Sequence, residues 1–356
     1  GITYGGRHEG LGRVVAIKEH FPRQFAYRDG TSTRLHASDP ATFSWALDRF
    51  LQEGRSLAAC KHAHVVDVSD VFEANGTAYM VLAYEDGQSL AGWLQQLGRP
   101  PTQAELDAIV MPLLDAMAFV HSKGLLHRDI APDNIMIRRD GKPCLIDFGA
   151  ARQAIAQRSQ VLSAIVKSGY SPPEQYTSTG RAQGAWSDIY ALGGTLYYAV
   201  TGQVPPEATD RAIEDTLEPA ARAVANPAAW RPAFLSGIDA ALRLRQAERP
   251  RSIGEWREQL MRDGAAADRR TATADTPPKL VEPRLDDIPG PSPESEPEAG
   301  KPPPDTGSRE RAEAIAQPPS GSLTGLYLAI AALIASVATT FALMALFHNN
   351  NWIIVG

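Results

Sequence analysis

Apolar and polar positions follow two different repeats along residues 1–263. Short runs rich in β-branched residues alternate with stretches in which apolar residues recur every three or four positions. This alternation predicts strands interspersed with amphipathic helices. The mixture, at globular density throughout, predicts one α+β domain with two lobes.

One predicted helix carries a charge on its apolar face. Ala46, Phe50, Glu53 and Leu57 are separated by four, three and four positions, so they share one face of a helix. A carboxylate on such a face is costly unless it is paired. We therefore expect Glu53 to meet a cation, and a solvated position at the rim of the helix is the alternative.

Two short apolar runs, 134–137 and 143–146, are separated by polar residues that include Asp140-Gly141. Asp-Gly is a preferred two-residue hairpin turn, and with this turn Asn134 lies opposite Asp147. Asp129 precedes Asn134 by five residues, so a third oxygen group can converge there. Hard oxygen ligands of this kind suit Mg²⁺. Taken singly, each of these residues is better explained as part of an ordinary turn.

The composition changes after residue 263. Residues 264–322 contain 12 prolines among acidic and small polar side chains, which is typical of an extended linker without a core. Residues 323–347 contain no charged side chain, and a helix of that length exceeds the ~30 Å hydrocarbon core of a bilayer. We expect one transmembrane helix here, and a buried globular helix is the alternative.

Charges around residues 323–347 predict its orientation. Arg309 and Arg311 precede the span, and no Lys or Arg follows it in 348–356, which places the first domain on the cytoplasmic side and 348–356 outside. Two pairs of small residues four apart, Gly325 with Ala329 and Ala332 with Ser336, are compatible with a homodimer of such helices.

Composition narrows the function classes. The chain has 356 residues, 44% of them hydrophobic, and a formal charge of -6 without a long basic tract, so we expect no nucleic-acid partner. The two cysteines, Cys60 and Cys144, lie far apart and predict neither a zinc site nor a disulfide framework.

The sequence His127-Arg128-Asp129, then Asn134, then Asp147-Phe148-Gly149 resembles the catalytic loop and the magnesium loop of protein kinases. The resemblance extends over residues 1–263 and implies a small β-rich N-lobe (1–85) and a large, mainly helical C-lobe (86–263). It implies that Asp129 orients the acceptor hydroxyl and that Asn134 and Asp147 hold Mg²⁺.

Other motifs extend the resemblance in the expected order. Val15-Ala16-Ile17-Lys18 resembles the strand whose lysine grips the phosphates of ATP, which makes Lys18 the natural partner of Glu53. Asp188 resembles the carboxylate that steadies the catalytic loop, with a plain helix cap as the alternative, and Glu174 with Arg249 resemble a buried pair that closes the activation segment. The residues that the resemblance places around ATP are Gly1, Thr3, Ala16, Lys18, Leu82, Ala83, Tyr84 and Met136.

Three departures from the kinase pattern stand out. Gly1 matches the last glycine of the Gly-rich phosphate loop and Thr3 its valine position, so the resemblance implies an N-terminally truncated fragment without the first strand. Ala131 stands where serine/threonine kinases usually have a lysine that neutralises the transferred phosphoryl. Lys167 stands where a threonine usually contacts the catalytic loop.

The resemblance implies a membrane-anchored bacterial serine/threonine kinase of the eukaryotic type, which acts on protein substrates with ATP and Mg²⁺ at the inner membrane. Three serines, Ser159, Ser163 and Ser168, are candidate phosphorylation sites whose phosphate would pair with Arg128. Ordinary loop serines are the alternative. Competing functions are a pseudokinase scaffold, favoured by Ala131, a small-molecule kinase, and a sensor with the kinase as its output.

Overall fold

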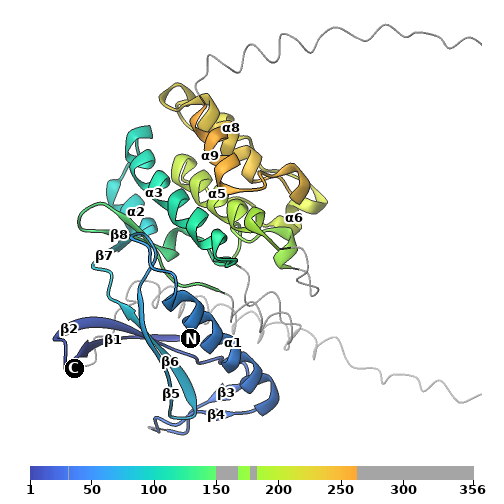
Figure 1. Ribbon diagram of the computed structural model, residues 1–356. Coiled ribbons are helices and arrows are strands. Elements are labelled where there is room, and N and C mark those ends of the chain that lie inside the picture. Colours follow the sequence, from blue (N-terminus) through green and yellow to red (C-terminus); the bar gives the residue numbers. More distant parts are fainter. Residues whose placement is uncertain (31, 150–166, 177–182, 263–356) are drawn as a thin grey trace, which may run out of the picture. The chain divides into compact units, whose positions relative to one another are not determined.

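The computed structural model describes residues 1–30, 32–149, 167–176 and 183–262 (Figure 1). The predicted linker (264–322), the membrane span (323–347), residues 348–356 and the candidate sites Ser159 and Ser163 all lie outside these ranges. Within the described ranges, no helix combines the length and the apolar character needed to cross a membrane.

Figure 1 shows a strand-rich lobe and a helical lobe. The strands are β1 (Ile2–His8), β2 (Arg13–Glu19), β3 (Ala26–Tyr27), β4 (His36–Ala37), β5 (Val68–Ala74), β6 (Thr77–Ala83), β7 (Gly87–Ser89), β8 (Ile135–Arg138) and β9 (Pro143–Leu145). The α-helices are α1 (Pro40–Ala58), α2 (Leu90–Leu97), α3 (Gln103–Ser122), α5 (Ala185–Thr201), α6 (Ala208–Ile213), α7 (Ala220–Ala223), α8 (Pro232–Ala241) and α9 (Ile253–Met261). Short 3₁₀ turns are η1 (Pro132–Asn134), η2 (Pro173–Gln175), η3 (Pro227–Ala229) and η4 (Gln246–Glu248).

The N-lobe sheet has the order β1-β2-β6-β5, and each neighbouring pair is antiparallel. Thr3 lies opposite Lys18 across β1 and β2, and Ala16 lies opposite Leu82 across β2 and β6. Cross-strand partners share a face of a sheet, and so do positions two apart on one strand. The register therefore puts these four residues on one face.

Helix α1 packs against the sheet through the face that the sequence predicts. Asp39 caps its first turn by accepting a hydrogen bond from the amide of Thr42. Its buried residues include Phe50, Glu53 and Leu57. Gly54 permits the close approach to the sheet, because a Cβ there would lie 2.7 Å from the side chain of Val71.

A two-stranded hairpin, β3–β4, covers the first turns of α1 and was not predicted from the sequence. Side chains in and beside the hairpin form a second, small core with two residues of α1: Phe25, Ala26 and Leu35 with Phe43 and Ala46. The strands have only two residues each, too short to show an alternating pattern. Tertiary packing, and not local periodicity, defines this element.

The C-lobe is built around α5, most of whose side chains are buried. Helices α7, α8 and α9 pack against it, and α3 packs against α9. The indole Nε1 of Trp256 on α9 donates to the carbonyl of Gly237 on α8 at 2.8 Å. One continuous apolar core runs from the N-lobe strands through α3 into α5 and α9. The sequence pattern of a two-lobed α+β domain is thus realised in the described residues.

The hairpin β8–β9 corrects one expectation about register. Ile135 pairs with Leu145 and Ile137 with Pro143, one residue away from the predicted alignment. The turn has three residues, 139–141, because the amide of Arg138 bonds the carbonyl of Lys142 and Gly141 takes a φ of 80°. Asn134 therefore lies beside Ile146 and not opposite Asp147.

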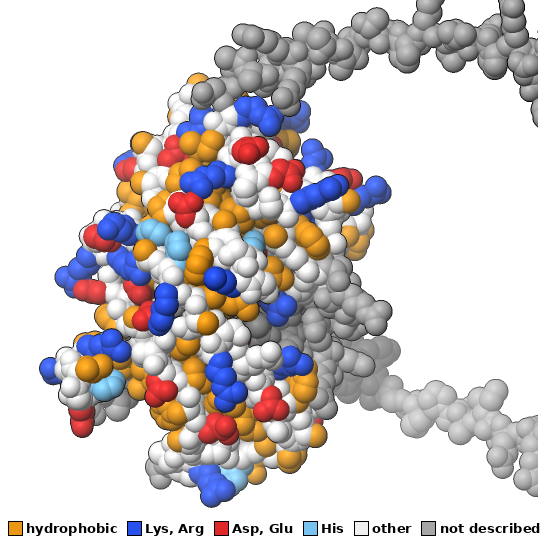
Figure 2. Space-filling model, viewed as in Figure 1, with side chains coloured by type: hydrophobic (Ala, Val, Ile, Leu, Met, Phe, Trp, Pro, Cys, Tyr) orange, Lys and Arg blue, Asp and Glu red, His pale blue; other side chains and the backbone are white. Residues whose placement is uncertain are grey.

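The two lobes are joined beside this hairpin. Leu145 exchanges backbone hydrogen bonds with the segment before β5, accepting from Val66 and donating to His64, each at 2.9 Å. The carboxylate of Glu85, just after β6, pairs with the Arg138 guanidinium of β8. On the face shown in Figure 2, basic and acidic side chains are interspersed across both described lobes.

Candidate active site

The loop that follows α3 holds a carboxylate and an amide in contact. The Asn134 amide nitrogen, Nδ2, donates to the backbone carbonyl of Asp129 at 2.6 Å and to its Oδ2 at 2.9 Å. Both side chains are buried. Because both donors of the amide face Asp129, its oxygen Oδ1 points to the other side and is available as a ligand or acceptor.

Asp147 follows β9 and lies between the segments that carry Asp129 and Asn134. The amide of Ile146 donates to the carbonyl of Asn134 at 3.0 Å, and the amide of Gly149 donates to the carbonyl of His127 at 2.9 Å. Asp147 takes a left-handed φ of 58° between these two anchors. This strained conformation directs its carboxylate into the space between the lobes. These backbone bonds bring the segment of Asp147 beside the segments of Asn134 and Asp129, although the predicted strand register was wrong.

Lys18 reaches this site from the N-lobe. Its Nζ lies 3.2 Å from Oδ1 of Asp147. Glu53 is buried on α1 and lines a cavity of about 310 Å³ together with Arg128 and Phe148. The pair between Lys18 and Glu53 stays a prediction, whereas the contact between Lys18 and Asp147 is a feature of the structure.

Asp188, at the start of α5, holds the backbone of the catalytic loop through hydrogen bonds to its carboxylate. Its Oδ2 accepts hydrogen bonds from the amide of His127 at 2.9 Å and from Nε2 of His121 at 2.8 Å, and its Oδ1 accepts from the amide of Arg128 at 2.7 Å. Burial disfavours the charged carboxylate, but the bonds from His121 and the amides outweigh it and hold the pKa of Asp188 below its ordinary value. Arg128 is held with a left-handed φ of 68°.

His127 and Phe148 pack ring on ring, with centroids 4.3 Å apart. Burial lowers the pKa of His127, so its imidazole is neutral. Its Nδ1 accepts from the amide of Asp129 at 3.3 Å, and its Nε2 donates to the carbonyl of Ile146 at 3.0 Å. The neutral ring therefore links the loop of Asp129 to the strand that leads into Asp147.

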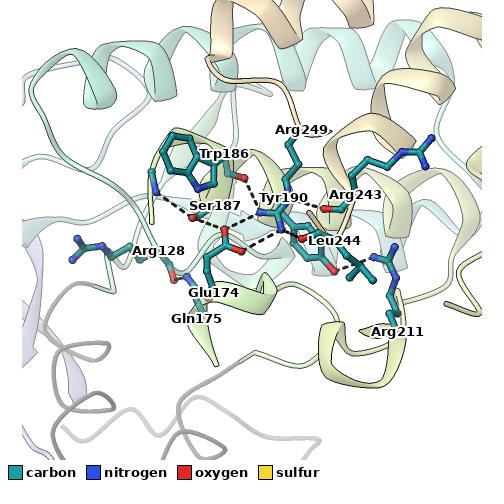
Figure 3. A network of polar contacts seen from close by, with 11 residues as sticks. Arg128, Glu174, Gln175, Trp186, Ser187, Tyr190, Arg211, Arg243, Leu244 and Arg249 are labelled. Carbon is teal, nitrogen blue, oxygen red and sulfur yellow. Dashed lines mark hydrogen bonds and ion pairs between the residues drawn. The ribbon is translucent and has the colours of Figure 1, made fainter. Parts of the chain in front are cut away.

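Glu174 and Arg249 form a buried ion pair at the end of the activation segment (Figure 3). Ser187 donates to the same Glu174 carboxylate at 2.7 Å, and Arg249 also donates to the carbonyls of Arg243 and Leu244. Gln175 donates to the carbonyl of Arg128 at 3.0 Å, which ties η2 to the catalytic loop. The resemblance implied the pair but not the bond from Gln175.

The residues predicted around the nucleotide lie on strands, or next to them, and in the connection between the lobes. Leu82 is buried at the end of β6, Ala83 is half-buried and Tyr84 is exposed in the connection. Met136 lies on β8 opposite Cys144. Gly1 directly precedes β1. Their roles toward ATP stay predictions.

Comparison with known proteins decides the family. The family model described as "Protein kinase domain" matches residues 3–252, more than half of the chain. The chain belongs to the protein kinase family. Its resemblance to bacterial kinases of the eukaryotic type is confirmed by its relatives.

Serine/threonine-protein kinase PknA of Nostoc sp. (strain PCC 7120) is 36% identical over 179 residues, covering 48% of this chain and 31% of that protein. Serine/threonine-protein kinase PknB of Mycobacterium tuberculosis is 31% identical over 232 residues, covering 60% of this chain and 36% of that protein. The solved structure described as "PpkA-294 apo form" matches with a TM-score of 0.65 and 36% identity, covering 73% of this chain and 91% of that chain. The kinase chain thus spans about a third of the length of these curated relatives.

The donor set of this kinase fits Mg²⁺ bound together with a nucleotide. Among the described residues, no group of three or more His, Cys, Asp and Glu could hold a metal ion. The available ligands are the Asp147 carboxylate, which is 38% exposed, and the amide oxygen of Asn134. Mg²⁺ prefers one or two such ligands and completes its shell with phosphate oxygens and water, so the site suits a cation that arrives with ATP.

A contact that the sequence did not predict joins the activation segment of this kinase to the catalytic loop. Lys167 Nζ lies 3.3 Å from Oδ2 of Asp133, one residue before Asn134. The signal available in the sequence was the charge of Lys167 at a position where the kinase pattern has threonine. The partner was not visible, since the two residues are far apart in the chain. Ser168, the one described candidate phosphorylation site, is exposed on the adjacent turn.

Proposed function

We propose that this kinase transfers the γ-phosphoryl group of Mg·ATP to serine and threonine hydroxyls of proteins. The single observation that carries the proposal is the 3.2 Å contact between Lys18 of the N-lobe and Asp147 of the C-lobe. A cation and a carboxylate from different lobes meet there, beside Asp129 and Asn134. In such an arrangement the ammonium holds the phosphates of a nucleoside triphosphate, and the carboxylate holds the cation bound to them.

The residues of the site divide the work as follows. Lys18 orients the phosphates, and Asp129, fixed by the Asn134 amide, orients the acceptor hydroxyl and takes up its proton. Asn134 and Asp147 would hold Mg²⁺, which neutralises phosphate charge when it is bound. The chemistry relies on positioning, so the rigid support from Asp188 is part of the mechanism.

The test is transfer of label from γ-³²P-ATP by the full chain, read both as autophosphorylation and with dephosphorylated casein as acceptor. We expect labelled phosphoserine and phosphothreonine, and loss of all label in Asp129→Asn. The matched control is Asp140→Asn at the exposed tip of the β8–β9 hairpin, which should keep the activity. An unaltered chain that labels no more than Asp129→Asn would instead favour a scaffold without catalysis.

We also propose that residues 323–347 anchor the kinase in the bacterial inner membrane, with residues 1–263 in the cytoplasm and 348–356 outside. The support is the uncharged stretch of 25 residues and the arginines before it. A homodimer through Gly325 and Ala329 belongs to the same proposal. Carbonate extraction of membranes tests it: release of the full chain into the soluble fraction would contradict an anchor.

A further inference from the structure

The catalytic loop of this kinase contributes a single Lys or Arg side chain of its own. Residues 127–134 include Asp129 and Asp133, and their one permanently charged base is Arg128. Arg128 lines the cavity beside Glu53 and Phe148, under α1. Ala131, two residues after Asp129, is fully buried and uncharged. Charge that develops on a phosphoryl group near Asp129 must therefore be neutralised from another segment.

Lys167 is the described side chain that brings a positive charge to this loop from the activation segment. Its Nζ lies 3.3 Å from Oδ2 of Asp133, which is four residues after Asp129. In the structure the lysine side chain is 29% exposed and that of Asp133 64% exposed. An ion pair with so much solvent contact contributes little stability. The ammonium can therefore exchange its carboxylate partner for a phosphoryl oxygen at small cost.

The backbone of Lys167 is held firmly. Its amide donates to Oγ of Ser171 at 3.1 Å, and its carbonyl accepts from the amides of Tyr170 at 3.1 Å and of Ser171 at 3.0 Å. Gly169 closes this turn with a φ of 79°, against the carbonyl of Pro205, which a Cβ would approach to 2.5 Å. A fixed backbone with a long, half-exposed cation places a charge near the loop without a conformational search.

We propose that Lys167 contacts the transferred phosphoryl group and stabilises it in the transition state, in place of a cation within the catalytic loop. This inference rests on the proposed function. The acceptor oxygen forms a bond to the γ-phosphorus while the bond from that phosphorus to the β–γ bridging oxygen breaks. The electron pair of the broken bond leaves with ADP, and the hydroxyl proton passes to Asp129. Lys167 stays protonated throughout and acts by its charge.

The proposal couples chemistry to the placement of the activation segment. Lys167 belongs to the stretch that Gln175 ties to the carbonyl of Arg128 and that Glu174 ties to Arg249. A displaced segment would remove the cation from the site while Lys18, Asp129 and Asp147 stay in place. Loss of transfer with retained nucleotide binding is the expected signature of such a displacement.

The test compares four variants of the full chain with the unaltered kinase, using γ-³²P-ATP and casein. We expect Lys167→Met to lower kcat roughly 100-fold while KM for ATP stays within about twofold. Lys167→Arg should recover at least about a tenth of the activity, since it keeps the charge. Asp133→Asn breaks the ion pair but keeps the cation, so its kcat should stay within about threefold of the unaltered kinase. Lys142→Met is the matched control, because Lys142 Nζ also lies 3.3 Å from an aspartate, Asp140, on an exposed turn.

A second readout does not depend on turnover. Calorimetry should show that the unaltered kinase binds MgADP with aluminium fluoride, a mimic of the transferred phosphoryl, more tightly than MgADP alone. Lys167→Met should lose this gain and keep its affinity for MgADP. Equal losses of kcat in Lys167→Met and Asp133→Asn would overturn the proposal. They would show that the ion pair between Lys167 and Asp133 only holds the two segments together. A Lys167→Met enzyme with only a raised KM for casein would overturn it in favour of substrate binding.

The outcomes also separate this proposal from the proposed function. An unaltered chain as inactive as Asp129→Asn overturns both. An active unaltered chain whose Lys167→Met variant transfers phosphate at the same kcat overturns the role of Lys167 alone. Thermal unfolding of each variant, compared with Lys142→Met, distinguishes a loss of fold from a loss of charge.

Discussion

The Arg249 guanidinium and the Glu174 carboxylate form a bidentate ion pair, with Nη1 2.8 Å from Oε1 and Nη2 3.2 Å from Oε2. The side chain of Arg249 is 0% exposed and that of Glu174 is 2% exposed. Arg249 precedes α9, and Glu174 lies in η2 at the end of the activation segment. The pair therefore fixes that segment to the interior of the C-lobe. Its burial also makes each partner dependent on the other.

Removing one partner of this pair should be strongly destabilising. We expect Arg249→Met to lower the free energy of unfolding by about 3–5 kcal/mol, because it leaves the Glu174 carboxylate buried without a cation. Urea unfolding followed by circular dichroism measures this. The double variant Glu174→Gln, Arg249→Met should be more stable than Arg249→Met alone. Arg245→Met, which breaks an exposed pair with Glu248, is the control and should cost no more than about 1 kcal/mol.

Asp188→Asn should damage catalysis more than stability. An amide has a single acceptor oxygen, so it cannot serve the amides of both His127 and Arg128, and its nitrogen would face an N–H group. The loop that carries Asp129 would shift, and we expect kcat to fall by about two orders of magnitude. Kinetics with casein checks this. Asp115→Asn on the surface of α3 is the control, and an Asp188→Asn enzyme as active as that control would refute the supporting role.

Gly149→Ala tests the close packing around Asp129. A Cβ at this position would lie 2.9 Å from the Cβ of Asp129, so either the aspartate or the segment after β9 must move. We expect kcat to fall at least about tenfold, with a smaller change in thermal stability. Gly254→Ala on α9 is the control, since its nearest neighbour would be 3.8 Å away. Equal kcat values for the two variants would show that the space beside Asp129 is not critical.

His20 should make stability depend on pH. Burial between Phe43 and Phe50 lowers the pKa of His20 to about 4, whereas an unfolded histidine titrates near 6.5. The unfolded chain binds the proton first, so this stability is fully present above the unfolded pKa and is lost as pH falls from about 6.5 toward 4. Between pH 7 and pH 5 the contribution is on the order of 2 kcal/mol.

Substitution His20→Leu isolates this contribution. The loss of unfolding free energy between pH 7 and pH 5 should be smaller in His20→Leu than in the unaltered chain by that amount. His36→Leu, at a half-exposed histidine of the β3–β4 hairpin, controls for the number of histidines. Identical pH profiles of His20→Leu and the unaltered chain would contradict the assignment.

The sequence was informative where local pattern and chemistry agree. The face of α1 with Phe50, Glu53 and Leu57 follows from helical spacing alone. The contact of Asn134 with Asp129 agrees with the expectation that they converge at the open end of one hairpin. The register of that hairpin was predicted wrongly, because Asp-Gly serves both two-residue and three-residue turns. In this turn Gly141 has a left-handed φ and Asp140 does not, whereas a two-residue type I′ turn would require a left-handed φ at both.

Contacts between distant segments were harder to predict. The bond from Gln175 to Arg128 and the pair of Lys167 with Asp133 join residues that no local pattern relates. The small core under β3–β4 likewise depends on α1 for two of its five side chains, Phe43 and Ala46. In each case the partner is set by the folded chain, so spacing in the sequence carries no signal for it.

The three-residue turn 139–141 governs how the hairpin tolerates change in length. Side chains on a strand alternate between faces, so one residue added to or removed from this turn would exchange the faces of every position paired across it. Met136 and Cys144 would no longer stand opposite each other, and Asp147 would emerge one step out of phase with Asn134. Among related sequences, we expect substitutions at Arg139 and Asp140 to be common. We expect insertions and deletions in this turn to be rare, because they would lower activity.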